Sequence, residues 1–186
     1  FKKYNFYNKK IISYKKNKGK GYAVKSGVLA ANGEYIIFID ADGSINPSQI
    51  KKMLKYLKKY YVIVGTRTSR KSQVKIPFFR KFIGISFNKY ANLLFNINID
   101  DTLCGFKGFK KEVAKDLFKN LIDNRWIFDV ELFYKIRKNN YSLYRMPIKW
   151  EYKDKSKMTI ADIFKIAITM LILRFKLMGK IISNLI

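Results

Sequence analysis

The sequence predicts an α/β fold with a largely parallel sheet. Two short apolar runs rich in β-forming residues, 35–39 and 61–65, have the length of buried strands. Stretches with helical spacing of apolar side chains lie before and between them, and glycine or proline bounds each stretch. Strands that alternate with helices are joined by crossover connections, which make neighbouring strands parallel.

Local signals place the other elements along the chain. Asn32-Gly33 is a good helix stop, and Pro47 suits the first turn of a helix. The elements expected in order are a strand over residues 11–14, a helix over 22–31, a strand over 35–39, a helix from Pro47 to about residue 59, a strand over 61–65, a helix over 78–95, an extended or turning segment over 102–109, helices over 110–121 and 128–138, a strand over 141–150 and one long amphipathic helix over 161–186.

The composition describes a folded but very basic chain. Its 186 residues are enough for one core, and 39 Lys and Arg against 13 Asp and Glu give a net charge of +26. Only 7 of these cations are Arg, the residue that base readout favours, and the lysines are spread along the whole chain. We therefore expect no nucleic-acid partner. A basic module that binds nucleic acid or an anionic membrane remains the non-enzymatic alternative.

The chain contains no His and one cysteine, Cys104. These counts exclude a Ser-His-Asp or Cys-His catalytic site, a His-ligated zinc site and an internal disulfide within these residues. Catalysis would have to use carboxylates, Lys, Arg, Tyr and a metal ion held by oxygen.

Two carboxylates, Asp40 and Asp42, follow directly after the strand at 35–39. Like charges this close repel each other, and a divalent cation with a phosphorylated ligand would relieve the repulsion. Ligands of open α/β sheets bind at the carboxyl ends of strands. We therefore expect Mg²⁺ or Mn²⁺ here, holding a nucleotide diphosphate. The alternative is a plain polar turn, since Gly43 and Pro47 follow.

Candidate phosphate-binding residues occur before and after this strand. In the segment Lys18-Gly19-Lys20-Gly21 the glycines would let backbone approach a ligand, and the lysines offer positive charge. Arg67 follows the strand at 61–65, on the edge of the sheet where a ligand is expected, and an arginine fork matches phosphate geometry.

The order and spacing of these motifs resemble the family 2 glycosyltransferases, which have a GT-A fold. The resemblance is greatest to the polyprenyl-phosphate sugar transferases, which include the dolichyl-phosphate β-glucosyltransferases and mannose synthases, and it covers about residues 11–160. The segments that carry it are residues 17–21, Asp40-Ala41-Asp42, Gly65-Thr66-Arg67, Arg80, residues 101–107, residues 125–132, and Trp150-Glu151 with Ser156-Lys157.

The resemblance implies a Rossmann-like GT-A sheet, mainly parallel and flanked by helices, over residues 1–160. The family opens with two strands that bind the base and ribose, and neither is present. The chain is therefore expected to be an N-terminally truncated domain, and these residues alone are not expected to be fully active. Residues 161–186 are expected to form an amphipathic helix at a membrane surface, with packing against the core as the alternative.

The resemblance also implies a role for each candidate residue. Asp40 and Asp42 would hold the cation on the donor diphosphate, with Ser44 as a third ligand. Asp129 would orient the acceptor or the sugar, and an anionic acceptor phosphate needs no strong general base. The phosphate-binding residues implied are Lys18, Gly19, Lys20, Gly21, Arg67 and Arg80, with Lys107 on the acceptor side and a loop at Ser156 and Lys157 that closes over the site.

The expected reaction is transfer of a hexose to a polyprenyl or dolichyl phosphate with inversion. UDP-glucose is the preferred donor, and GDP-mannose, as used by dolichyl-phosphate mannose synthases, is the alternative. A second alternative is a family 2 transferase that acts on a saccharide acceptor. Such an enzyme would need Asp129 or Glu131 as a general base. The expected location is the cytoplasmic face of a membrane, the endoplasmic reticulum in a eukaryote or the plasma membrane in a prokaryote.

Overall fold

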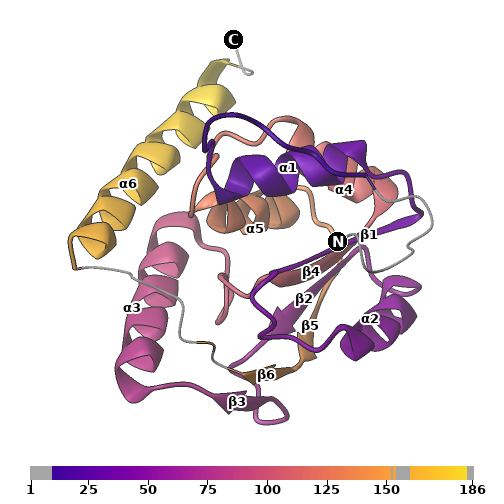
Figure 1. Ribbon diagram of the computed structural model, residues 1–186. Coiled ribbons are helices and arrows are strands. Elements are labelled where there is room, and N and C mark those ends of the chain that lie inside the picture. The colour runs from indigo at the N-terminus through magenta and orange to yellow at the C-terminus, as the bar shows by residue number, and fades with distance from the viewer. Residues whose placement is uncertain (1–9, 152, 154–159, 184–186) are drawn as a thin grey trace.

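A computed structural model describes residues 10–151, 153 and 160–183 (Figure 1). Within these ranges one four-stranded sheet lies between helices, and a two-stranded sheet stands beside it. The elements in order are α1 (Lys20–Ala30), β1 (Tyr35–Ile39), a 3-10 turn (Pro47–Gln49), α2 (Ile50–Leu57), β2 (Val62–Thr66), β3 (Gln73–Lys75), α3 (Phe78–Phe95), β4 (Phe106–Lys110), α4 (Lys111–Lys119), α5 (Phe128–Lys138), β5 (Leu143–Pro147), β6 (Lys149–Glu151) and α6 (Ile160–Ser183).

The main sheet is mixed rather than simply parallel. Its strand order is β1-β4-β2-β5, and β2 runs parallel to β5. Strand β4 lies between β1 and β2 and is antiparallel to both, with Ile37 opposite Gly108 in one pair and Ile63 opposite Gly108 in the other. Three strands thus share one direction, as the α/β pattern predicts, so the ends of β1 and β2 still open on the same edge.

Alternation of side chains along the strands gives the sheet two apolar faces. In β1, Ile36 belongs to one core cluster, whereas Ile37 packs against the other. The first cluster includes side chains of α4, α5 and α6, and the second contains Met53 and Leu57 of α2. Figure 1 shows the same arrangement, with α1, α4 and α5 on one side of the sheet and α2 on the other.

The strand expected at residues 11–14 is not present. These residues are described without regular structure, and the side chain of Ile11 is 75% exposed. Because no strand of either sheet pairs with them in the described chain, their β-forming composition has no ladder to join. The helix that follows also begins earlier than expected, at Lys20.

The remaining elements lie where the sequence predicts them, with local differences. The helices at 78–95 and 128–138 are confirmed at both ends. The segment at 102–109 contains the central strand β4, and the single strand expected over 141–150 is divided into β5 and β6. After β5 the chain leaves the main sheet, and β6 pairs with β3 in the second sheet. Strand β3 has three residues, and the sequence did not indicate it.

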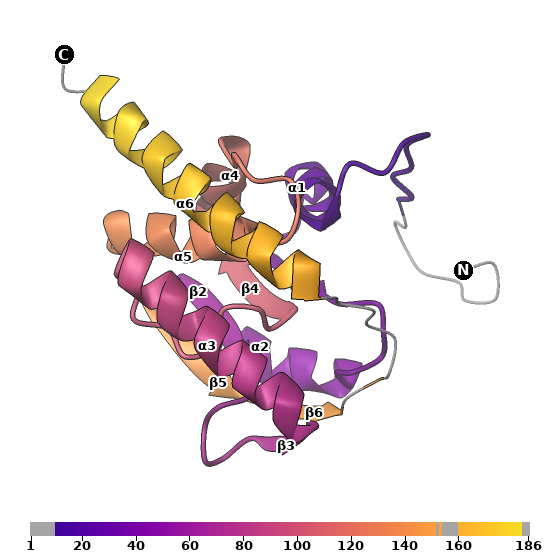
Figure 2. The same ribbon diagram turned by 90° about the vertical axis from the view of Figure 1, so that its left-hand side faces the viewer.

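Helix α6 packs on the core and also exposes an apolar side. Met170, Leu173 and Leu177 are buried in the first core cluster, whereas Phe164 and Phe175 are 69% and 71% exposed. Figure 2 shows α6 and α3 side by side across one face of the molecule. Among the described residues, no helix is both long and apolar enough to cross a membrane.

Candidate active site

A cavity of about 790 Å³ opens beside the end of β1. The β1–α2 connection, the loop before α5, the start of α1 and the first half of α6 form its walls. The residues that line it are Lys20, Asp40, Ala41, Asp42, Asp123, Arg125, Trp126, Ile127, Lys153, Asp162, Lys165, Ile166 and Thr169. Three of the sequence-predicted site residues, Lys20, Asp40 and Asp42, therefore meet in one cavity.

Asp40 is fixed in place from two sides. Its backbone N–H donates to the carbonyl oxygen of Gly105 at 2.9 Å, which continues the pairing of β1 with β4. Its carboxylate accepts from the ammonium of Lys20, whose Nζ lies 2.8 Å from Oδ1 and 3.1 Å from Oδ2. The side chains of Lys20 and Asp40 remain 28% and 33% exposed, so a ligand in the cavity can reach both.

The Asp42–Ser44 turn supplies two more oxygen groups. The Oδ1 of Asp42 accepts from the backbone N–H of Ser44 at 2.9 Å. Ser44 is buried, and its hydroxyl has no hydrogen-bond partner in the described structure. Carboxylate and hydroxyl oxygens are the donors that Mg²⁺ and Mn²⁺ take; Asp40 and Asp42 line the cavity, whereas Ser44 does not. Among the described residues, no group of three His, Cys, Asp or Glu side chains could hold a metal ion, so these side chains do not form a preformed site of that kind.

Gly19, just before α1, and Gly21, in its first turn, contact another loop, and neither lines the cavity. The N–H of Gly21 donates to Arg125 and that of Tyr22 to Asn124, both at 3.0 Å. A Cβ on Gly19, whose φ is +99°, would lie 2.3 Å from the carbonyl oxygen of Asn124. The glycines thus let two protein loops meet, and Lys18, which contacts Tyr22, lies outside the cavity lining.

Arg67 is held in a bidentate ion pair with Asp101, which was not among the predicted site residues. The Nε and Nη2 of Arg67 donate to the carboxylate of Asp101 at 2.9 and 2.6 Å, and its backbone N–H donates at 2.8 Å. Burial disfavours the charge of Arg67, but these bonds and the charge of Asp101 outweigh burial and raise the pKa of its guanidinium. The ring of Trp150 lies 5.2 Å from the guanidinium carbon.

Lys107 and Asp129 form a buried ion pair. The Nζ of Lys107 lies 2.7 Å from Oδ1 of Asp129 and donates to the carbonyl oxygens of Thr102 and Cys104 at 3.0 and 2.7 Å. These three bonds use all the hydrogens of the ammonium. Burial raises the pKa of Asp129, and the charges of Lys107 and Lys20 oppose this rise.

Whereas Asp129 pairs with Lys107, Glu131 binds the loop before α5. Its carboxylate accepts from the backbone N–H groups of Ile122 and Asp123 at 2.9 Å and pairs with Lys135 at 2.7 Å. It therefore fixes the loop before α5. That loop presents Trp126, 58% exposed, as one wall of the cavity. The signal in the sequence that could have indicated Trp126 is its place directly after the charged residues Asp123 and Arg125.

Other expected site residues lie apart from this cavity or outside the described chain. Arg80 occupies the first turn of α3 and does not line the cavity. Lys107 and Asp129 are buried, and neither is part of the cavity lining. Ser156 and Lys157, the expected closing loop, lie outside the described residues.

Curated proteins with similar sequences share most of this chain. A dolichyl-phosphate beta-glucosyltransferase of Trichomonas vaginalis is 34% identical over 168 residues, which are 86% of this chain and 50% of that protein. The enzymes of that name from Saccharomyces cerevisiae and Homo sapiens are each 30% identical, covering 92% and 84% of this chain and 56% and 51% of those proteins. The chain spans about half the length of these curated relatives.

Solved structures share the fold at low sequence identity. Glucosyl-3-phosphoglycerate synthase of Mycobacterium tuberculosis superposes with a TM-score of 0.59 at 14% identity, over 84% of this chain and 55% of that chain. A crystal structure of that enzyme in complex with Mn²⁺, uridine diphosphate and phosphoglyceric acid gives a TM-score of 0.58 at 14% identity, over 85% and 54%. The sequence profile of glycosyl transferase family 2 matches residues 1–118. With that match over more than half of its length, the chain belongs to glycosyl transferase family 2.

Proposed function

We propose that the protein containing this chain transfers glucose from UDP-glucose to a polyprenyl phosphate such as dolichyl phosphate. The observation that carries this proposal is the cavity in which Asp40, Asp42 and Lys20 meet at the end of β1. Family membership and relatives named dolichyl-phosphate beta-glucosyltransferase support glucose as the sugar and dolichyl phosphate as the acceptor. Because those relatives are about twice as long, further residues of the full-length protein would complete the base-binding side.

The donor diphosphate would lie against Asp40 and Asp42 with Mg²⁺ or Mn²⁺ between them. When bound, the cation would neutralise charge on the departing diphosphate. The Lys20 ammonium lies 2.8 Å from Asp40 in this structure. With a cation bound to the Asp40 carboxylate, Lys20 would be free to donate to a phosphate oxygen of the donor. The face of Trp126 would form one side of the space for the sugar.

Transfer needs one bond to form as another breaks. An oxygen of the acceptor phosphate attacks the anomeric carbon, the bond from that carbon to the β-phosphate oxygen of UDP breaks, and UDP leaves with the electron pair. Attack opposite the leaving group inverts the anomeric centre. The attacking oxygen is already anionic, so no side chain has to remove a proton.

Arg67 is the residue we assign to the acceptor phosphate. Arg67 is not part of the cavity lining, but Asp101 takes only Nε and one hydrogen of Nη2, so the Nη1 hydrogens would be the ones to bind a ligand. We assign positioning roles to Lys107 and Asp129, since their ion pair ties β4 to the start of α5 and so fixes the loop that carries Trp126. The implied phosphate contact of Arg80 remains a prediction.

We also propose that the protein works at the cytoplasmic face of a membrane, with the exposed side of α6 against anionic lipid. Phe164, Ile168, Ile172 and Phe175 are all at least 48% exposed on this helix, and Lys165 and Lys176 flank them. Apolar side chains bordered by cations are typical of a helix that lies in the interface of a bilayer.

Isothermal titration of UDP, with and without Mn²⁺, tests the donor site. The experiment uses this chain and the full-length protein, each as parent, Asp42→Ala and the control Asp100→Ala, whose carboxylate is exposed in a surface ion pair with Arg145. We expect Mn²⁺-dependent UDP binding by the full-length protein that Asp42→Ala lowers at least tenfold and Asp100→Ala leaves unchanged. Binding of GDP in place of UDP would indicate a mannose donor. Absence of nucleotide binding by the full-length protein would overturn the proposal.

A further inference from the structure

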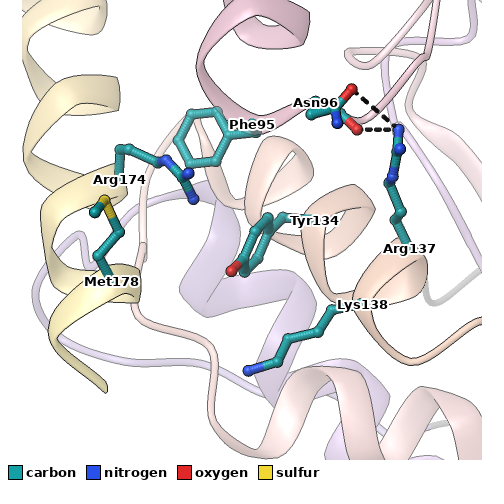
Figure 3. A pocket seen from close by; sticks show the side chains of 7 residues that line it. All are labelled: Phe95, Asn96, Tyr134, Arg137, Lys138, Arg174 and Met178. Atoms are coloured by element: carbon teal, nitrogen blue, oxygen red, sulfur yellow. Dashed lines mark hydrogen bonds between the residues drawn. The ribbon is translucent and has the colours of Figure 1, made fainter. Parts of the chain in front are cut away.

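A second cavity, of about 580 Å³, lies where the ends of α3 and α5 meet the second half of α6 (Figure 3). The first cavity is lined by other residues of α6, so the two share this helix but no side chain. The residues that line the second cavity are Phe95, Asn96, Tyr134, Arg137, Lys138, Arg174 and Met178.

Two aromatic rings, those of Phe95 and Tyr134, line this cavity. The rings of Phe95 and Tyr134 meet edge to face, with centroids 6.2 Å apart. The guanidinium carbon of Arg174 lies 5.9 Å from the Tyr134 ring. Arg137 donates to the backbone and side-chain oxygens of Asn96, the left-handed residue that ends α3. Packing and hydrogen bonds thus hold two of the cationic groups in position.

The positive charge around this cavity is uncompensated. Three cations line it, and none of the described lining residues is acidic. In the described part of the chain, no ion pair joins Arg137, Lys138 or Arg174 to a carboxylate. Like charges on neighbouring elements repel, so an anion that bridges them would stabilise the arrangement. Two arginines beside a lysine suit a phosphate, whose oxygens accept from a planar fork.

The surroundings of the cavity favour a phosphate that carries an apolar tail. Met178 lines the cavity and is 43% exposed, and Phe175 and Ile172 on the same helix are 71% and 48% exposed. On the neighbouring α3, Leu93 is 81% exposed. Figure 2 shows that these two helices share one face of the molecule. A free phosphate would use the cations but leave these side chains in water.

We propose that this second cavity binds the phosphate headgroup of an anionic membrane lipid, separately from the substrate site. The inference rests on the proposed membrane association and gives it a specific contact. Ile166 lines the first cavity and Arg174 the second, and eight residues of helix span about 12 Å. A lipid held at Arg174 would therefore anchor the helix that forms a wall of the candidate active site.

Binding to vesicles tests this proposal. The variant Lys138→Gln/Arg174→Gln is compared with Lys51→Gln/Lys55→Gln, which removes the same charge from α2, on the opposite face of the sheet. With phosphatidylcholine vesicles that contain phosphatidic acid, we expect the first variant of the full-length protein to bind about 30-fold more weakly than the parent. The second should lose less than about threefold. Equal losses would mean general attraction between charges and would overturn the proposal.

Two further measurements keep the test decisive if the double variant folds poorly. In the parent protein, phosphatidic acid vesicles should protect Lys138 from acetylation and leave Lys55 reactive, whereas equal reactivity would contradict a specific site. Soluble glycerol phosphate should not displace the protein from vesicles, and displacement would identify a free phosphate as the ligand and overturn the lipid assignment. The UDP titration decides the transferase proposal independently, because the lining of the second cavity contains no residue of the first.

Discussion

Gly105 and Asp40 are packed so closely that no side chain fits between them. The N–H of Asp40 donates to the carbonyl oxygen of Gly105 at 2.9 Å, and a Cβ on Gly105 would lie 1.9 Å from Oδ2 of Asp40. The first carboxylate of the candidate metal site therefore rests on the backbone of the residue that precedes β4. The glycine and the carboxylate are 65 residues apart in the chain and depend on each other's position.

Replacing Gly105 should therefore disturb the metal site. We expect Gly105→Ala to displace the Asp40 carboxylate and to weaken Mn²⁺-dependent UDP binding by the full-length protein at least tenfold, as measured by titration calorimetry. Gly27→Ala is the matched control, because a Cβ there meets no atom within 4 Å and alanine is the better helix former. Unchanged affinity in Gly105→Ala would contradict a role for Asp40 in binding.

Asp101→Asn should be far more costly than the same change at its neighbour, Asp100. Asp101 is buried and pairs with Arg67, whereas Asp100 is exposed and pairs with Arg145 on the surface. We expect the first change to lower the free energy of unfolding by about 3 kcal/mol and the second by less than about 1 kcal/mol. Denaturant titrations measure both. Similar small losses would show that the Arg67 ion pair does not hold the fold.

The Lys107–Asp129 pair should show strong coupling in a double-mutant cycle. Lys107→Met or Asp129→Leu alone leaves one buried charge without its partner, at a cost of about 3–5 kcal/mol in unfolding free energy. The double variant should lose much less than the sum, because both charges are then gone. Additive losses, determined by chemical unfolding, would mean that the two side chains act independently.

Cys104 should be inert in the folded protein. Burial raises the pKa of its thiol from 9.0 to about 12, so very little reactive thiolate is present at pH 8. Iodoacetamide followed by mass spectrometry should modify the unfolded chain and leave the native chain unmodified. Above about pH 9 the unfolded chain releases this proton while the native chain retains it, so unfolding free energy should fall as pH rises. Cys104→Ala should remove that part of the fall.

The exposed phenylalanines of α6 should contribute to membrane binding but not to folding. We expect Phe164→Ser/Phe175→Ser to bind anionic vesicles at least about tenfold more weakly, with an unchanged thermal midpoint, because both side chains are mostly in water in this structure. Ile11→Ser/Ile12→Ser, which removes exposed apolar groups elsewhere, is the control. Equal vesicle binding by parent and variant would exclude this side of α6 from the interface.

Local sequence patterns predicted most helices and both partners of the Lys20–Asp40 and Lys107–Asp129 pairs, but only Arg67 of its pair with Asp101. The helical spacing over 78–95 and 128–138 gave those elements their correct ends, and the apolar run at 35–39 with Asp40 and Asp42 gave the strand and its charged end. The strand predicted at residues 11–14 was wrong, because a β-forming segment becomes a strand only when another strand lies beside it.

Sequence by itself thus determined the α/β class, the charged end of β1, the absence of histidine chemistry and the resemblance to a transferase family. Only the tertiary structure decided that β4 lies between β1 and β2, that Asp101 holds Arg67 and that Lys107 is buried against Asp129. The physical reason is distance along the chain. Helix and strand signals act within a few residues, whereas these pairings join residues 22 to 75 positions apart and form only when the whole core is assembled.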